Sequence, residues 1–192
     1  MDVLRAIIRR LDDWLSRREG VIPFTDNPRV ILRLQVGRAS HELHLPEATI
    51  PIGSKVLYLH AWNERMPRIP PEGADLTYAV QLHRLQIHSL KAVAKHILAE
   101  SYLQDIQAIS GVTAHISWKE ADGGRAMMEG FGFTILPYHR PFGAFGEFWE
   151  NFYAWWLMWT YNPASVRYRK MRNLQRAEFW MTKVRFLERY GR

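Results

Sequence analysis

The chain has 192 residues, of which 47% are hydrophobic, and its formal net charge is +7. This length and hydrophobic content favour a single folded domain with an appendage and exclude general disorder. Because the sequence contains no cysteine, it excludes disulfide frameworks, thiolate metal sites and cysteine nucleophiles, and it fits a reducing compartment.

The positive charge is concentrated near the C-terminal end of the sequence. Residues 162–192 hold nine Lys and Arg against two Glu, a net charge of +7 that equals the excess of the whole chain. The remaining residues are therefore neutral overall. Such asymmetry indicates an anionic partner for the basic tail.

Residues 2–18 predict an amphipathic helix, because apolar residues recur there at i, i+3 and i+4. We expect it to pack on the protein's own core. A place at a membrane surface is the alternative, since Arg and Trp suit that environment. Arg5, Arg9 and Arg10 interrupt the apolar residues, so no signal peptide is predicted and we expect a cytoplasmic protein.

Strands follow this helix. Residues 30–36 predict a strand, Gly37 and Arg38 a turn, and residues 41–45 its hairpin mate. Residues 56–62 predict a buried strand, after which several prolines form a stiff loop.

The middle of the chain alternates between helix and strand. Residues 77–101 predict a long central helix, 111–116 a strand, 122–129 a short helix and 133–136 another strand. This order predicts an α+β (mixed α/β) fold with one central, mostly antiparallel sheet.

The composition changes abruptly at Phe142. Ten of the twenty residues in 142–161 are aromatic. A helix of this length is about 30 Å long, enough to cross a bilayer, but Glu147 and Glu150 fall on one stripe, and Trp and Tyr prefer the membrane interface. After a break at Asn162-Pro163, an apolar stripe predicts a last helix over 163–189. We therefore divide the chain into an α/β domain, 1–141, and a helical docking segment, 142–192.

The run 125–135, Arg-Ala-Met-Met-Glu-Gly-Phe-Gly-Phe-Thr-Ile, follows a helix and a strand. It resembles the closing motif of the GNAT acyltransferase fold, in which a short helix ends in a Gly-Phe turn and leads into a strand. GNAT enzymes bind the acyl-CoA pyrophosphate with a glycine-rich loop just before the central helix. We assign that place to residues 81–88, which hold no glycine. The resemblance therefore implies a degenerate GNAT-like fold, and we expect no cofactor.

A second resemblance covers roughly residues 28–138. It rests on Gly37-Arg38, Ile52-Gly53-Ser54-Lys55-Val56, Leu59-His60-Ala61-Trp62-Asn63, the long helix, Gly111-Val112-Thr113 and Glu129-Gly130-Phe131-Gly132-Phe133. This order resembles the YkoP-like family of small bacterial domains, which implies no particular activity. We expect the aromatic and basic segment from Phe142 onward to lie outside the resemblance.

His60 and Asn63, at the end of a predicted central strand, are the catalytic candidates by position. No serine, cysteine or carboxylate pair is placed in sequence to complete a nucleophile–base set. We expect them instead to tie the following proline-rich loop to the sheet. The eight histidines form no metal-binding pattern, so no metal site is expected.

These features favour a non-catalytic, membrane-extrinsic subunit or adaptor, peripheral to the inner membrane. It would dock on a membrane protein complex, of which photosynthetic and respiratory complexes are the kind of host, or on the cytoplasmic bilayer surface. The residues expected to dock are Phe145, Phe148, Trp149, Phe152, Trp155, Trp156, Trp159, Arg167, Arg169, Lys170, Arg172, Arg176 and Lys183.

Two alternatives remain open. One is an acyl- or sugar-modifying enzyme of GNAT-like fold that uses His60. The other is nucleic-acid binding through the basic tail, where aromatic rings interleaved with Arg could stack on bases. No small-molecule substrate is evident from the sequence.

Overall fold

The computed structural model describes residues 2–113, 123–139, 143–167, 171 and 174–192. Its helices are α1 (Asp2–Arg18), α2 (Leu76–Ala99), α3 (Gly123–Gly130), α4 (Gly143–Tyr161) and α5 (Lys183–Tyr190). Its strands are β1 (Leu32–Arg38), β2 (Leu43–His44), β3 (Thr49–Ile50), β4 (Lys55–Ala61), β5 (Ala108–Thr113), β6 (Thr134–Pro137) and β7 (Ala177–Thr182). Short 3-10 helices are η1 (Asn63–Arg65), η2 (Ser101–Leu103) and η3 (Pro163–Val166).

Local sequence signals set the C-terminal end of α1 and the N-terminal end of α2. α1 stops after Arg18, where Gly20 takes a positive φ of 73° and the amide of Val21 donates to the carbonyl of Ser16. α2 begins after Asp75, whose carboxylate accepts a hydrogen bond from the amide of Tyr78 at 2.7 Å. The predictions of a helix over 2–18 and of a long helix from 77 are confirmed within one or two residues.

The main sheet has the strand order β1-β4-β5-β7-β6. β4 and β5 run parallel, whereas β1 with β4, β5 with β7 and β6 with β7 are antiparallel. β2 and β3 form a separate two-stranded pair. The predicted α+β class with a mostly antiparallel central sheet is confirmed.

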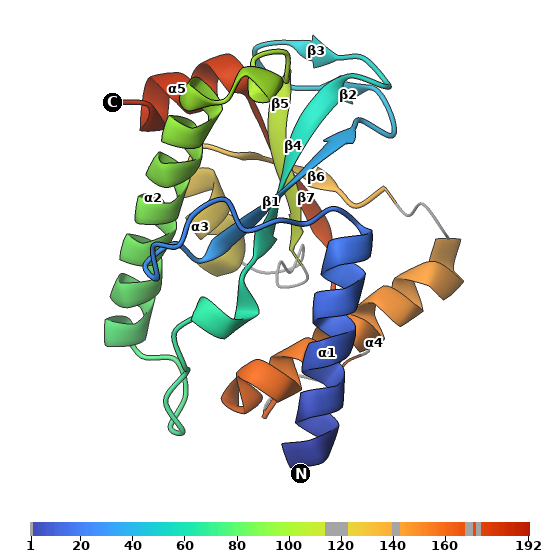
Figure 1. Ribbon diagram of the computed structural model, residues 1–192, viewed down its shortest axis with the longest axis vertical. Coiled ribbons are helices and arrows are strands. Elements are labelled where there is room, and N and C mark those ends of the chain that lie inside the picture. The colour runs from blue at the N-terminus through green and yellow to red at the C-terminus, as the bar shows by residue number, and fades with distance from the viewer. Residues whose placement is uncertain (1, 114–122, 140–142, 168–170, 172–173) are drawn as a thin grey trace.

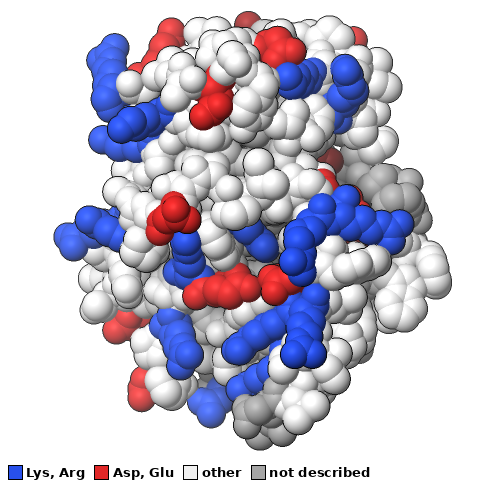
Figure 2. Space-filling view, in the orientation of Figure 1, with Lys and Arg blue, Asp and Glu red and all other residues white. Residues whose placement is uncertain are grey.

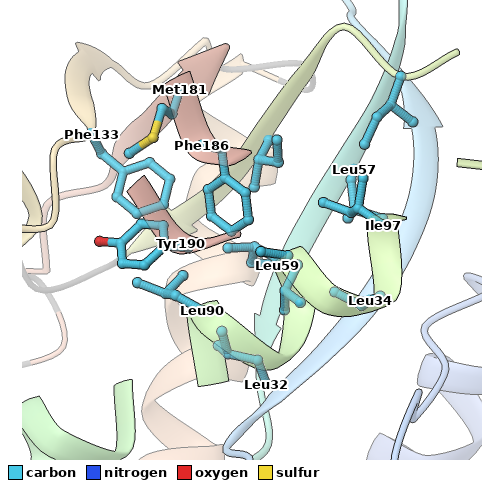
Figure 3. Close-up of a cluster of buried hydrophobic side chains, with 14 of the residues drawn as sticks. Leu32, Leu34, Leu57, Leu59, Leu90, Ile97, Phe133, Met181, Phe186 and Tyr190 are labelled. Atoms are coloured by element: carbon cyan, nitrogen blue, oxygen red, sulfur yellow. The ribbon is translucent and has the colours of Figure 1, made fainter. Parts of the chain in front are cut away.

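One face of the sheet carries the main core. α2 and α5 lie on this side of the sheet, with α1 and α4 on the other (Figure 1). Leucines of β1 and β4 meet Leu90 and Ile97 of α2 and Phe186 and Tyr190 of α5 (Figure 3). This layer excludes water from a continuous apolar cluster and supplies most of the apolar burial of the fold.

The opposite face is covered in two parts. The β2–β3 pair covers Val56, Ala108 and Trp180 with a second apolar cluster. The second part of this face is polar and lies on β1 and β4, where its residues alternate with the leucines of the main core. It includes Arg33 and His60, which are cross-strand neighbours. α1 and α4 contact each other over this polar part.

β7 shows that the predicted last helix over 163–189 is wrong for most of its length. Residues 177–182 form a strand between β5 and β6, and α5 begins only at Lys183. All six residues of β7 are buried. An apolar run buried on both faces has no strand alternation, so its periodicity cannot be told from that of a buried helix.

The predicted hairpin of 30–36 with 41–45 is also wrong, because β1 pairs with β4. Gly37 lies within β1 and makes no turn. A Cβ at this position would lie 2.7 Å from Cε2 of Tyr58, so glycine is needed there for close packing. The turn before β4 uses Gly53 instead, whose φ is 81°.

The expected division at residue 141 runs through the sheet. β7 and α5 belong to the segment 142–192, and they pair or pack with elements from the first part of the chain. The segment is helical in α4, as predicted. None of the described helices, α4 included, is long and apolar enough to span a bilayer.

We expect truncation after residue 141 to abolish cooperative thermal unfolding, because β6 then loses the strand that joins it to the sheet.

In the full chain, Trp180→Ala or Phe186→Ala should lower the free energy of unfolding by about 3–5 kcal/mol. Urea denaturation measures this change. The control Val184→Ala, at an exposed position of α5, should change it by less than about 0.5 kcal/mol. A cooperative transition in the 1–141 fragment would contradict the assignment of β7 to the core.

Candidate functional site

His60 lies on the polar part of the sheet and is largely enclosed. One ring nitrogen, Nε2, hydrogen-bonds to Oε1 of Gln35 at 2.8 Å, on the neighbouring strand. Burial, together with the nearby guanidinium of Arg33, lowers the pKa of His60 to about 4. The imidazole is therefore neutral near pH 7. Among the described residues, its side-chain hydrogen bond is with Gln35 and not with a nucleophile or a carboxylate.

Asp12 and Arg33 form a buried ion pair between α1 and the sheet. Their closest charged atoms, Oδ2 and Nη2, lie 3.7 Å apart. Tyr153 of α4 donates a hydrogen bond to Oδ1 of Asp12 at 2.7 Å. Burial raises the pKa of Asp12, and the Tyr153 hydrogen bond and the charge of Arg33 offset part of that rise. The three side chains thus join α1, α4 and β1.

This polar layer is incompletely satisfied. Oδ2 of Asp12 and Nε of Arg33 are buried without a hydrogen-bond partner in the part of the chain that the structure describes. Removing one partner of such a pair leaves the other charge buried and unpaired. This costs more free energy of folding than an exposed ion pair contributes. The layer therefore fixes the position of α1 and α4 against the sheet.

Asn63 opens the 3-10 helix η1 and does not join His60 in a site. Within the described residues, neither side chain forms a hydrogen bond with the proline-rich loop, contrary to the prediction. Asn162 instead ties this loop to the end of α4: its side chain accepts from the amide of Ile69 at 3.0 Å and donates to the carbonyl of Pro67 at 3.0 Å. The sequence showed Asn162 only as a helix break.

The aromatic residues of α4 form a continuous row of ring contacts. Neighbouring ring centroids lie 5.0–6.2 Å apart along Phe145, Trp149, Phe152 and Trp156, with Phe148 also against Trp149. Rings this close, mostly edge to face, support one another's orientation. The row therefore forms one semi-rigid aromatic surface.

Exposure divides this row into two halves. Phe145, Phe148 and Trp149 are 76%, 48% and 51% exposed, whereas Phe152, Trp155, Trp156 and Trp159 are half-buried. The C-terminal half of α4 is held by α1 and η1. Arg5 lies over the ring of Trp159 at 5.2 Å, and Tyr161 donates to Glu64 at 2.8 Å. The exposed aromatic end, defined here as Phe145, Phe148 and Trp149, has no such cover among the described residues.

The basic residues predicted to dock have varied surroundings. Arg176 is nearly buried and contacts Asn151 at 2.8 Å and Glu150 at 3.6 Å. Lys183 donates to the carbonyl of Gln104, and the exposed Arg167 donates to that of Pro71 at 2.8 Å. Their positive charges are thus partly used within the chain. Arg169, Lys170 and Arg172 lie outside the described residues.

α1 exposes a second apolar surface that the predicted site omits. Its residues Val3, Leu4, Ile7, Leu11 and Trp14 are exposed, whereas Ile8 is buried. Figure 2 shows Lys and Arg gathered on the lower part of the face on which α1 lies. The amphipathic spacing of residues 2–18 was the available signal, but packing on the core accounts for only one side of the helix. No group of three or more His, Asp or Glu suited to a metal ion occurs within the residues that the structure describes.

The family model of the YkoP domain matches residues 39–190. The chain belongs to the YkoP domain family. No curated protein and no solved structure matches it. The relation to the GNAT fold therefore stays a prediction.

The YkoP match corrects the expected extent of the resemblance. It runs through α4, β7 and α5, so the aromatic and basic segment from Phe142 is part of the family domain. It begins at residue 39, after α1 and β1. Residues 81–88, the expected place of a phosphate loop, lie inside α2. Their lack of glycine therefore says nothing about such a loop.

We expect His60→Gln to reduce the acid sensitivity of this YkoP protein. The folded-state pKa of His60, about 4, lies below its ordinary value of 6.5, so the unfolded chain takes up the proton first as the pH falls. Stability is lost between about pH 6.5 and pH 4, by at most about 3 kcal/mol from this residue. Urea midpoints of both proteins at pH 7 and pH 4.5 measure the difference. Equal acid losses would contradict a buried neutral His60.

Proposed function

We propose that this YkoP-domain protein is a non-catalytic peripheral protein that attaches to a membrane surface through the exposed aromatic end of α4. The observation that carries the proposal is the exposure of Phe145, Phe148 and Trp149. Three large aromatic side chains at one end of a helix expose apolar area that a partner would bury.

The chemistry of this end suits a membrane interface. The ring of Trp combines a large apolar body with one polar N–H group, and aromatic side chains gather where the bilayer meets water. The ring contacts along α4 hold the exposed rings in place before binding. Less conformational entropy is therefore lost on attachment than with isolated, mobile side chains.

The contacts of α4 with the rest of the protein hold this helix in a fixed orientation. The C-terminal half of the helix is anchored by Asn162, by Tyr161 and by contacts with α1. An attachment at the N-terminal end would therefore orient the whole YkoP domain. This suits an adaptor or an extrinsic subunit, on a bilayer or on a membrane protein complex within it.

The surroundings of His60 favour the proposed non-catalytic role over the alternative of an enzyme that uses this residue. Its imidazole is neutral and hydrogen-bonded to Gln35, and Arg33 beside it is paired with Asp12. A general base must reach the proton that it takes from a substrate, and a nucleophile–base pair must lie within hydrogen-bond reach, whereas Nε2 of His60 is hydrogen-bonded to Gln35. The basic tail residues Arg176 and Lys183 are engaged within the chain, which weakens the case for nucleic-acid binding.

We expect the triple variant Phe145→Gln, Phe148→Gln, Trp149→Gln to lose membrane attachment. If each side chain contributes about 1 kcal/mol, the partition onto native membranes falls roughly 100-fold. Flotation of membranes from cells that make the full-length protein measures the bound fraction, and a salt wash tests how much of it is electrostatic.

The matched control replaces three exposed apolar residues elsewhere, Ile52→Gln, Leu98→Gln and Val184→Gln. This variant should float with membranes as the wild type does. A wild-type protein found wholly in the soluble fraction at low salt, with no large complex on a sizing column, would exclude the proposed function.

A further inference from the structure

We propose that α1 lies in the plane of an anionic lipid bilayer as an interfacial helix, with its exposed apolar residues among the acyl chains and its arginines at the headgroups. This inference rests on the proposed membrane attachment and names its partner as lipid. A different helix carries it, however, and it can fail separately.

The first observation is an apolar stripe on α1 without a partner in the described chain. Val3, Leu4, Ile7, Leu11 and Trp14 are between 37% and 76% exposed. At 100° per residue, their positions fall within about 100° of the helix circumference. α1 has 17 residues and is therefore about 25 Å long. The apolar stripe on its exposed side runs from Val3 to Trp14 and is therefore about 17 Å long.

The second observation is that the opposite side of α1 is fixed. Ile8 is buried, and Asp12 is held by Arg33 of the sheet and Tyr153 of α4. These contacts prevent the helix from rolling its apolar stripe inward. The stripe is therefore presented to solvent as a built feature of the fold, already helical before any partner binds.

The third observation is the charge beside the stripe. Arg10 and Arg17 border one of its edges, and Arg18 lies 5.4 Å from the ring centroid of Trp14 within it. All three side chains are exposed. Arg10 has no hydrogen bond or ion pair with a described residue. The side chain of Asp12 is buried, which leaves Asp13 as the exposed acidic residue in the middle of the helix.

This combination fits an anionic bilayer. Interfacial helices carry apolar residues and Trp on one side and Arg or Lys at its edges, where the long side chains reach the phosphates. The positive charge on the exposed edge is complementary to anionic headgroups. A second copy of this chain would instead place the same arginines against each other.

A fluorescent label on α1 tests the orientation directly. Because the chain has no cysteine, Ile7→Cys gives the full-length protein a single thiol for the environment-sensitive dye NBD. Leu98→Cys on α2 is the matched control, since Leu98 is 55% exposed and Ile7 is 56% exposed. With vesicles of phosphatidylcholine and phosphatidylserine, we expect blue-shifted emission, quenched by spin-labelled acyl chains, from position 7 only. No shift at position 7, or equal shifts at both positions, would overturn the proposal.

Charge variants and apolar variants of α1 separate the electrostatic contribution to vesicle binding from the apolar contribution. Binding is measured by vesicle sedimentation. Arg10→Gln with Arg17→Gln should weaken binding roughly 30-fold at low salt, and phosphatidylcholine vesicles should bind the wild type weakly. Lys91→Gln with Lys95→Gln, at exposed positions of α2, is the control and should bind as the wild type does. Ile7→Gln with Leu11→Gln should weaken binding at low and at high salt. Wild-type affinity in either α1 variant would overturn the proposal.

The outcomes distinguish this inference from the proposed function. If the α4 triple variant leaves native membranes while the Ile7→Gln, Leu11→Gln variant stays, attachment through α4 holds and the inference about α1 fails. If position 7 inserts into vesicles and the α4 variant still binds, the inference holds and the role of α4 fails. A dimer in sedimentation velocity that Ile7→Gln with Leu11→Gln abolishes would identify a second copy as the occupant and overturn the inference.

Discussion

β7 pairs with β5 along one edge and with β6 along the other, and every one of its residues is buried. The sheet is therefore completed by a strand that is distant in sequence from its neighbour β5, and this strand joins the edge strand β6 to the rest of the sheet. α5 begins directly after this strand, and the pairing places Phe179 and Met181 in the main core. The aromatic helix is thus an excursion between β6 and β7, both of which belong to the sheet.

A buried polar layer complements this apolar construction. Arg33, Asp12 and Tyr153 come from three separate elements and meet on the sheet face opposite the main core. Such a layer contributes less to stability than an apolar one of equal volume, but its directional contacts select one arrangement of the helices. The surfaces that α1 and α4 leave exposed follow from this arrangement.

Much of the fold could be predicted from local patterns. The helices 2–18 and 77–101 have clear amphipathic periods and end signals, and their predicted and observed bounds nearly coincide. Strand partners could not be predicted in the same way, because pairing depends on contacts between distant residues. β7 was missed since burial on both faces removes strand alternation.

The candidate site divides in the same manner. Composition alone indicated that the segment from Phe142 has more aromatic residues than one buried face needs. Only tertiary contacts decide that Phe145 stays exposed and Trp159 lies under Arg5. Arg176, one of several similar basic residues in the sequence, is neutralised by Glu150, which lies on a different element.

The position of β7 has a consequence for synthesis on the ribosome. β5 pairs with β7 across more than 60 residues of chain, and β6 pairs in the sheet with β7. While the chain grows from its N-terminal end, β5 therefore has one open edge and β6 has no place in the sheet until β7 emerges. Open strand edges attract other chains. This topology thus delays completion of the sheet until β7 has been synthesised, and the open edge of β5 is exposed to other chains during that interval.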